Sequence, residues 1–387
     1  MLVRVDYNVP LNEDGEVADD TRLVASLATV RYLLQKGAAL VLCSHLGRPK
    51  GKRDPRYSLA PVARRLSRLL RQEVPLATDC IGPEVEAQAR SLQPGAVLLL
   101  ENLRFHAGEE ANDPAFADGL ARLGEAFVND AFGAAHRAHA SVVGVAERLH
   151  PAVAGFLMQS ELEALRPLLE APAKPFVAIL GGAKVSGKLD VILSLLPRVD
   201  ALLIGGGMMF TFHRAQGGEV GNSLVEPDRL ERAREIVEQA RTAGVRLLVA
   251  PDCRAAPSLD GGPVQVVPAG AVPAGWTGAD IGPESEALFA EALADAQTIL
   301  WNGPMGIFEK PAFASGTLRI AHLLAERTAA GAHTIVGGGD SAAALAAADL
   351  TERVSHVSTG GGASLDFLEG KILPGVQALD DREVSHA

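Results

Sequence analysis

The residues best suited to chemistry lie in one stretch, Phe176 to Lys188, which reads FVAILGGAKVSGK. Its apolar run predicts a buried strand, and the two glycines that end the run let the backbone turn tightly and approach a ligand closely. If a helix begins near Val185, its free N–H groups face an anion, and Lys184 and Lys188 share one helix face. We interpret this stretch as a phosphate-binding turn. The alternative is an ordinary strand–turn–helix with two solvated lysines.

The second half of the chain repeats this pattern of an apolar run that ends in glycines, which favours the phosphate-binding interpretation. Several short apolar runs end in glycines, and together they would form a floor that a flat, phosphorylated ligand can approach closely. The best anion site among them is Val336 to Ala344, where three glycines precede Asp340 and Ser341 at a predicted helix start. The glycine-rich ends follow Phe176–Leu180, Ala201–Ile204, Thr298–Trp301, Thr334–Val336 and Val354–Val357.

Two common nucleotide-binding motifs are incomplete in this sequence. Gly182 to Lys188 fits GxxxxGK, but Leu189 occupies the position where a P-loop needs Ser or Thr to hold Mg²⁺. None of the glycine triplets extends to GxGxxG, so a dinucleotide fold of the dehydrogenase type is disfavoured as well.

The first half alternates predicted strands and helices, which indicates a parallel sheet with right-handed crossovers. Ligands of such sheets bind outside the carboxyl ends of the strands. The guanidinium fork of arginine suits carboxylate and phosphate groups, so a basic edge here indicates an anion site, although solvated loop arginines are the alternative. A zinc site at His136 and His139 lacks partner ligands. The residues at this edge are Asp6, Asn8, His45, Arg48, Arg104, His136, Arg137 and His139, with Arg22 on the first crossover helix.

Composition narrows the class of protein. The 387 residues suggest two or three domains, and 48% hydrophobic with 21% charged residues is typical of a globular protein. A net charge of −11 argues against general binding to nucleic acid or an anionic membrane. Three widely spaced cysteines without metal-ligand spacing indicate reduced thiols, and we find no signal peptide and no transmembrane-length apolar run. We therefore expect a cytoplasmic protein.

A predicted helix separates the two halves. Phe156–Leu169 has one apolar face, with Ser160 and Glu163 as a capping box, and a proline-rich break follows at residues 172–175. The sequence thus predicts an α/β protein with two doubly wound, parallel-sheet (Rossmann-like) lobes joined by a hinge helix. The predicted boundaries are 1–155 for the first domain, 156–173 for the hinge and 174–373 for the second domain.

Motifs along essentially the whole chain resemble phosphoglycerate kinase, in the order of that family. They are VRVDYNVP, SHLGRPKG, ENLRFHAGEE, NDAFGAAHRAHAS, LGGAKVSGK, WNGPMGIFE, GGGDS, STGGGASLDFLEGK and PGV. The resemblance implies reversible transfer of a phosphoryl group from 1,3-bisphosphoglycerate to ADP, which gives 3-phosphoglycerate and ATP, with Mg²⁺. It also implies a monomer, a phosphoglycerate-binding first domain, a nucleotide-binding second domain, and a C-terminal tail, residues 374–387, that packs on the first domain.

The resemblance assigns roles by motif position. Phosphoglycerate would be bound by Asp6, Tyr7, Asn8, Arg22, His45, Leu46, Gly47, Arg48, Arg104 and Arg137. The nucleotide would be bound by Gly181, Gly182, Lys184, Lys188, Gly205, Gly206, Asn302, Pro304, Glu309, Gly337, Gly338, Gly339, Asp340 and Ser341, with Asp340 also meeting the metal. The catalytic residues would be Arg22, Lys184, Gly338 and Gly339.

We expect direct in-line transfer after hinge closure, because the sequence offers no activated nucleophile and the acceptor carboxylate is already ionised. Family members usually have a short leader before VRVD, whereas Met1 stands only two residues ahead of it here. We therefore expect either a short first strand or a chain that begins inside the full sequence. Two alternatives remain, namely a kinase of another small acid and a non-catalytic nucleotide-binding protein, although the presence of Arg22 and Lys184 counts against the second.

Overall fold

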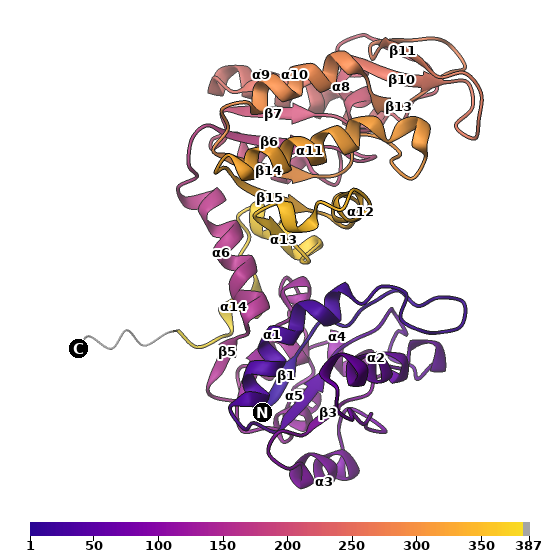
Figure 1. Cartoon of the computed structure of the whole chain (residues 1–387). Helices are drawn as coiled ribbons and strands as arrows, with labels where there is room; N and C mark the ends of the chain where they lie inside the picture. Colours follow the sequence, from indigo (N-terminus) through magenta and orange to yellow (C-terminus); the bar gives the residue numbers. More distant parts are fainter. Residues whose placement is uncertain (382–387) are drawn as a thin grey trace. The chain divides into compact units, whose positions relative to one another are not determined.

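The computed structural model describes residues 1–381, which form two compact units (Figure 1). The first unit comprises Met1–Glu163 and the segment from Ile372 onward, and the second comprises Ala164–Lys371. The division falls inside helix α6 (Phe156–Glu170), which covers most of the stretch that the sequence predicts as a hinge. Of the predicted C-terminal tail, residues 382–387 lie outside the described part of the chain.

The first unit contains a five-stranded parallel sheet in the order β3-β2-β1-β4-β5. Its central strand, β1, is only three residues long but pairs on both sides, so that Val3 lies between Leu42 of β2 and Val128 of β4. A buried strand so close to the start of the sequence fits the predicted short first strand. The strands are β1 (Leu2–Arg4), β2 (Leu40–Cys43), β3 (Val97–Leu99), β4 (Phe127–Asn129) and β5 (Ala152–Ala154), of which β5 was not predicted.

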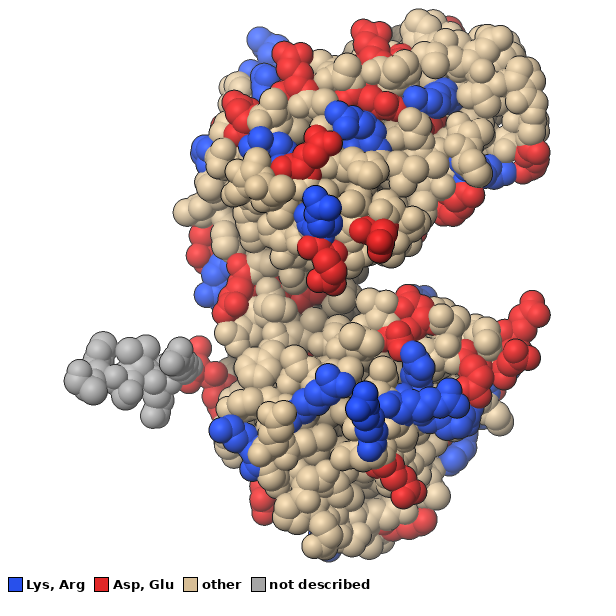
Figure 2. All heavy atoms as spheres, in the orientation of Figure 1, with Lys and Arg blue, Asp and Glu red and all other residues tan. Residues whose placement is uncertain are grey.

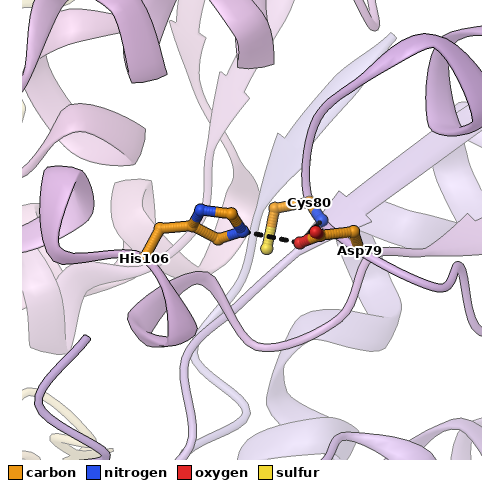
Figure 3. A group of neighbouring side chains, drawn as sticks. All are labelled: Asp79, Cys80 and His106. Atoms are coloured by element: carbon orange, nitrogen blue, oxygen red, sulfur yellow. Dashed lines mark hydrogen bonds and ion pairs between the residues drawn. The ribbon is translucent and has the colours of Figure 1, made fainter. Parts of the chain in front are cut away.

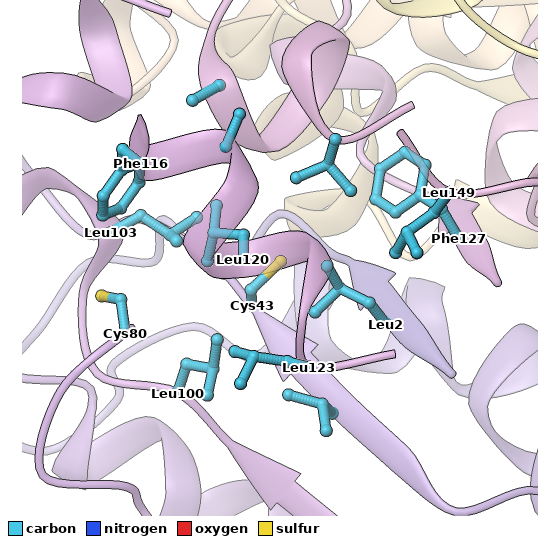
Figure 4. Packing of buried hydrophobic residues seen from close by; sticks show 14 of the residues in the cluster. Leu2, Cys43, Cys80, Leu100, Leu103, Phe116, Leu120, Leu123, Phe127 and Leu149 are labelled. Carbon is cyan, nitrogen blue, oxygen red and sulfur yellow. The ribbon is translucent and has the colours of Figure 1, made fainter. Parts of the chain in front are cut away.

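Alternating strand residues build two separate cores, one on each face of this sheet. Val3, Leu42 and Leu99 pack with α1 (Thr21–Gln35) and α2 (Ala60–Leu70) on one face. The intervening residues of the same strands, with Leu100 just after β3, pack on the opposite face with α3 (Pro83–Ser91) and α5 (Pro114–Ala121), and Figure 4 shows Cys43 beside Leu120 in this cluster. Helices on both faces make this unit doubly wound, as predicted.

The second unit contains a six-stranded parallel sheet in the order β16-β15-β14-β6-β7-β9. A three-stranded antiparallel sheet, β11-β10-β13, and a two-stranded sheet, β12-β8, were not predicted. Two parallel-sheet units nevertheless confirm the predicted α/β class. The parallel strands are β6 (Phe176–Leu180), β7 (Ala201–Ile204), β9 (Arg246–Val249), β14 (Thr298–Asn302), β15 (His333–Gly337) and β16 (His356–Val357), and the others are β8 (Glu219–Val220), β10 (Asp252–Ala256), β11 (Gln265–Pro268), β12 (Ala271–Val272) and β13 (Thr277–Ile281).

The remaining helices connect these strands. None of the helices within residues 1–381 is long and apolar enough to cross a lipid bilayer. They are α4 (Ala107–Glu110), α7 (Leu189–Leu195), α8 (Met209–Ala215), α9 (Leu230–Ala243), α10 (Pro283–Leu293), α11 (Ser315–Ala329), α12 (Gly339–Ala347), α13 (Gly362–Leu368) and α14 (Pro374–Gln377).

The predicted capping box of the hinge helix is wrong. Helix α6 begins at Phe156, so Ser160 lies inside it and its hydroxyl donates to the Leu157 carbonyl. The cap comes instead from a distant residue, because the Asp130 carboxylate accepts hydrogen bonds from the N–H groups of Leu157 at 2.9 Å and Met158 at 3.2 Å. A cap supplied across the fold leaves no local sequence signal.

The segment that follows the second unit packs on the first. The Gly375 N–H donates to the Ala135 carbonyl at 2.8 Å, and the Asn129 side chain donates to the Gly375 carbonyl at 3.1 Å. Asp380 accepts from the Ala152 N–H at 2.7 Å, next to β5. These bonds join residues more than 200 positions apart in sequence and make the last described residues part of the first unit.

Candidate active site

The carboxyl edge of the first sheet gathers most of the basic residues that the sequence predicts for a site. Asp6 and Asn8 follow β1, and Arg48 follows β2. Arg104 lies in a single helical turn, Leu103–Phe105, after β3, and Arg137 lies in the loop after β4. Because the strands are parallel, their carboxyl ends meet at one edge, which brings these side chains together from four separate stretches of sequence.

A chain of hydrogen bonds orders this edge. The Arg22 Nη1 donates to the Asp6 carboxylate at 2.9 Å, and the other oxygen of that carboxylate accepts from the Asn8 N–H at 3.2 Å. The Asn8 side chain in turn accepts from the Gly47 N–H at 2.8 Å. The Arg104 Nη1 donates to the Gly47 carbonyl at 2.8 Å. Two arginines are thus held at fixed positions before any ligand arrives, which lowers the entropic cost of binding an anion.

Glycine is required at position 47. Its φ is +60°, in the left-handed region, and a Cβ there would overlap the ring of Tyr57. The neighbouring Leu46 side chain lies in the core, and its N–H and carbonyl are both held by the Asn102 side chain. Asn102, which sequence reasoning missed, therefore positions this turn from the end of β3.

Tyr7 is placed differently from the other predicted site residues. Its side chain is fully buried, its hydroxyl lies 2.9 Å from the Ser26 hydroxyl, and burial raises the pKa of its phenol above the usual range. The side chains of Tyr7 and Leu46 therefore face the core, and their N–H groups are bonded to the Ser44 hydroxyl at 2.8 Å and to the Asn102 side chain at 3.2 Å.

His45 is a neutral imidazole in a strongly positive environment. Its pKa is held well below the ordinary value, first by burial and then by Arg4, Arg104, Arg137 and Arg22. The four arginines lower this pKa by their positive charge, and Arg4 also contacts the ring directly, with its Nη2 3.1 Å from the His45 Nδ1. A neutral ring can accept a hydrogen bond from an arginine without adding to their mutual repulsion.

Arg4 is a buried arginine that sequence reasoning missed. It lies in β1 with no exposed surface, donates from Nε to the Ser141 hydroxyl at 2.8 Å, and approaches the His45 Nδ1 at 3.1 Å. One charged residue in the apolar run LVRV was the available signal, since an arginine is almost never fully buried unless it is paired. Arg48, by contrast, is exposed.

Other arginines of the first unit face solvent and are paired with acids. Figure 2 shows Lys and Arg gathered on the front of this unit, around α2, while the visible face of the second unit mixes both signs. Arg64 and Arg65 on α2 pair with Glu16 at 2.7 Å and Asp20 at 2.6 Å. Exposed pairs of this kind contribute little stability, and they are separate from the arginines around His45.

The carboxyl edge of the second sheet is built from closely packed glycine turns. The Gly181 N–H donates to the Asn302 carbonyl at 3.0 Å, and the Gly182 N–H donates to the Pro304 carbonyl at 2.7 Å. Gly206 has φ +63°, and a Cβ there would lie 2.5 Å from the Gly182 nitrogen. Only glycine allows these turns after β6, β7 and β14 to lie against one another.

Lys184 and Lys188 do not share a helix face, so that prediction is wrong. Helix α7 begins at Leu189, and both lysines lie in the turn before it. The Lys188 ammonium folds back and donates to the carbonyls of Gly181 and, at 2.9 Å, Asn302. Burial lowers its pKa to about 8, although the Asp340 carboxylate opposes the shift. Lys184 is exposed.

Helix α12 starts at this edge, directly after the predicted glycine triplet. Gly338 precedes it with φ +89°, and Asp340 lies in its first turn. The Ser341 hydroxyl accepts a hydrogen bond from the Gly303 N–H at 2.7 Å, which ties the helix start to the turn after β14. A nine-residue helix with free N–H groups behind glycines offers an anion a positive end and close backbone approach.

A pocket of about 350 Å³ adjoins these turns. Its lining is glycine-rich on one side and includes the apolar side chains Leu224, Leu259 and Ile307 on another. Such a lining suits a flat ring system with a charged end. Of the residues predicted for a nucleotide, those that line it are Gly182, Gly206, Pro304, Glu309 and Asp340.

Asp280 in β13 accepts a hydrogen bond from the Gly316 N–H in the first turn of α11, at 2.8 Å, and is expected to make the stability of the second unit depend on pH. Burial raises its pKa to about 7, against weaker opposing effects of the Gly316 N–H and Arg254. An acid whose pKa is higher in the folded state is destabilising once it ionises, so its effect on stability grows from about pH 4 to about pH 7. Three pKa units correspond to about 4 kcal/mol, an upper bound because Arg254 and solvent screen the charge.

We therefore expect Asp280→Asn to flatten the fall in the free energy of unfolding between about pH 4 and pH 7. Urea unfolding of wild type and variant across this range measures the difference. Asp295→Asn, at an exposed position, is the matched control and should reproduce the wild-type slope. A variant slope equal to that of wild type would show that Asp280 ionises normally.

Comparisons with known proteins match this chain to phosphoglycerate kinases over nearly its whole length. A family model described as phosphoglycerate kinase matches residues 1–371. The phosphoglycerate kinase of Chlorobaculum tepidum is 55% identical over 382 residues, covering 98% of this chain and 96% of the relative. The cytosolic phosphoglycerate kinase of Triticum aestivum is 56% identical and covers 98% of this chain and 95% of the relative.

Solved structures give the same result. The phosphoglycerate kinase of Coxiella burnetii superposes with a TM-score of 0.87 at 43% identity and covers 97% of this chain and 95% of that one. The enzyme of Pyrococcus horikoshii superposes with a TM-score of 0.85 at 32% identity, covering 98% of this chain and 95% of its own. With matches of this extent, the chain is a kinase that belongs to the phosphoglycerate kinase family.

Proposed function

We propose that this enzyme performs the reaction of its family, transfer of a phosphoryl group from 1,3-bisphosphoglycerate to ADP, by direct in-line displacement. The observation that carries the proposal is the ordering of arginines at the carboxyl edge of the first sheet, where the Asp6 carboxylate holds Arg22 at 2.9 Å and the Gly47 carbonyl holds Arg104 at 2.8 Å. Fixed guanidinium groups at one edge of a protein of net charge −11 suit a small, multiply charged anion.

The first unit would bind the phosphoglycerate. Asp6 and Asn8 would lie near its single hydroxyl group and hold Arg22 and Gly47 in place, as their contacts with these residues suggest. Tyr7 and Leu46 would support the neighbouring turns from the core, since their side chains are buried and their N–H groups are bonded to Ser44 and Asn102. The anionic groups would be bound by Arg22, His45, Arg48, Arg104 and Arg137.

The second unit would bind the nucleotide in the pocket beside β6 and β14. Lys188 would meet a phosphate, and Glu309, which lines the pocket, would accept hydrogen bonds from the ribose. Gly181, Gly182, Gly205, Gly206, Asn302 and Pro304 would form the floor, and the backbone N–H groups of Gly337 to Ser341 would hold the phosphates at the start of α12.

A magnesium ion fits beside Asp340. The carboxylate stands in the first turn of α12, close enough to Lys188 to affect its pKa, and Mg²⁺ commonly uses one or two protein carboxylates together with substrate phosphates. Bound there, the ion would neutralise phosphate charge. Lys188 would then share the remaining negative charge of the nucleotide with the glycine N–H groups.

The transfer itself would need charge stabilisation rather than a protein nucleophile. The acceptor oxygen on ADP or 3-phosphoglycerate is already anionic, so no strong general base is required. Arg22, Lys184 and the N–H groups of Gly338 and Gly339 would donate to the oxygens of the moving phosphoryl group. Because Arg22 belongs to the first unit and Lys184 to the second, we propose that a hinge movement at α6 accompanies each turnover.

The first experiment is a coupled assay with 3-phosphoglycerate and Mg-ATP, with acetate and carbamate as control acceptors. ADP release that depends on 3-phosphoglycerate supports the proposal. Equal rates with acetate or carbamate would point to a kinase of another acid, and nucleotide binding without turnover would point to a binding protein.

We also propose that the enzyme is a cytoplasmic monomer. Cys43, Cys80 and Cys253 are all free thiols, as in proteins of reducing compartments, and the wheat relative is named cytosolic. Sedimentation equilibrium should give a single species of about the 40.4 kDa chain mass.

A further inference from the structure

A mixed set of metal-binding side chains lies outside the anion site of the first unit. Asp79 and Cys80 belong to the loop before α3, and His106 directly precedes α4 (Figure 3). Their donor atoms, one carboxylate oxygen, one sulfur and one ring nitrogen, all lie within 4.8 Å of one another. No other group of three or more His, Cys, Asp or Glu side chains in residues 1–381 meets this criterion.

We propose that Asp79, Cys80 and His106 form a binding site for a zinc-class divalent cation, with water as the fourth ligand. Zn²⁺ takes thiolate, imidazole and carboxylate ligands in tetrahedral geometry, whereas Mg²⁺ requires oxygen ligands in an octahedron. The presence of sulfur and nitrogen together therefore selects against the magnesium that serves the nucleotide. Three protein ligands and an open position are typical of an exchangeable zinc site.

The present geometry needs only a small adjustment. With bonds of roughly 2.0–2.3 Å, the donor atoms of a tetrahedral zinc site are about 3.3–3.7 Å apart. The His106 Nε2 and Asp79 Oδ1 are 2.6 Å apart and joined by a hydrogen bond, so a cation would separate them by less than about 1 Å while the sulfur moves inward by a similar amount. The Asp79 and His106 side chains are 40% and 30% exposed, so both can shift and water can reach them.

A zinc-class cation would bind Cys80 as the thiolate, so binding must release the thiol proton. As the sulfur–metal bond forms, the thiol proton leaves to solvent, and the thiolate charge is balanced by the ion.

Neighbouring contacts would hold the ligands in position. The Cys80 N–H donates to the Asp79 carboxylate at 2.7 Å, and the Glu101 N–H donates to the Asp79 carbonyl at 3.4 Å. The Cys80 thiol donates to the Glu101 carbonyl at 2.9 Å, and the ion would replace this bond. The His106 ring packs on Phe116 with centroids 5.1 Å apart. The two ligand segments are thus anchored on α3, β3 and α5, and partners of this kind orient metal ligands in known sites.

Cobalt is the probe for this site, because a Co²⁺–thiolate bond gives a charge-transfer absorption that a complex without sulfur lacks. Titrating the metal-free full-length enzyme with CoCl₂ in excess Mg²⁺ should produce this absorption at one equivalent, and Zn²⁺ should abolish it. Cys80→Ser should remove the band. His106→Gln and Asp79→Asn should weaken binding at least about 10- to 100-fold, as loss of even an outer partner of a ligand does.

Cys43→Ser and Cys253→Ser are the matched controls, since each alters another buried free cysteine, and both should keep the band. Circular dichroism of each variant confirms that it is folded. The proposal is overturned if wild type gives no charge-transfer band, if the band survives in Cys80→Ser, or if folded His106→Gln and Asp79→Asn bind cobalt as tightly as wild type.

Discussion

Replacing Arg22 with alanine is expected to lower kcat by about 100- to 1000-fold, the loss seen when one donor to a developing negative charge is removed. Arg22 lies on α1 with its side chain 34% exposed, and one of its nitrogens is held by Asp6 at 2.9 Å. Its remaining donors are free to meet a phosphoryl group. Because this contact would strengthen during transfer, the dissociation constant of ADP should change less than about threefold.

Steady-state kinetics with both substrates, together with calorimetric ADP titration, measure this separation. Arg31→Ala is the matched control, because Arg31 lies on the same helix but donates to the Leu69 carbonyl. Arg22→Lys should recover only part of kcat, because an ammonium group lacks the planar fork of donors. A large loss of ADP affinity with kcat intact would contradict the assigned role of Arg22.

Replacing Lys184 and replacing Lys188 should have opposite effects on turnover and on ADP affinity. Lys188→Met should raise the dissociation constant of ADP by about 10- to 150-fold, the equivalent of one hydrogen bond to a charged group. The half-buried Lys188 ammonium also donates to the carbonyls of Gly181 and Asn302, so its loss would loosen the glycine turns of the pocket. Lys184→Met should instead lower kcat by about 100-fold or more and leave ADP affinity within about threefold of wild type.

Each lysine variant serves as the control for the other, since both remove one ammonium group from the same turn. Calorimetric titration with ADP and saturation kinetics separate affinity from turnover. If Lys184→Met loses ADP affinity while Lys188→Met keeps it, the two roles are exchanged. Equal effects on both quantities in both variants would mean that the turn acts as one unit.

Sequence reasoning located the strands and their polar ends well. Short apolar runs followed by glycine or charged residues mark where a parallel strand stops, and the edge of a parallel sheet then brings those residues together. This is why the sequence alone places Asp6, Arg104 and Arg137 in one region and predicts a helix start at α12.

Features that depend on the folded surroundings were missed. The helix expected at Val185 begins at Leu189, and the ammonium of Lys188 folds back to the Gly181 and Asn302 carbonyls, a contact that local sequence does not reveal. Arg4 looks like an isolated charge in a strand until Ser141 and His45 are brought to it.

The same limit applies to contacts between distant segments. Cys80 and His106 are 26 positions apart, so no ligand spacing marks them in the sequence, and only the loops at the ends of neighbouring elements make them neighbours. Asp130 likewise caps a helix that starts 26 residues later, which no local capping motif can indicate.

The hydrogen bonds that tie Gly375 and Asp380 to the first unit bear on how the chain is made. Residues 1–163 are synthesised first. The segment from Ile372 onward, which bonds to Ala135 and Ala152, is synthesised only after the whole second unit. The second unit is continuous in sequence and can complete itself as it emerges, since domains generally fold as units during synthesis. The first-made unit is therefore the last to be finished, and a nascent chain that stalls before residue 372 would carry an incomplete first unit.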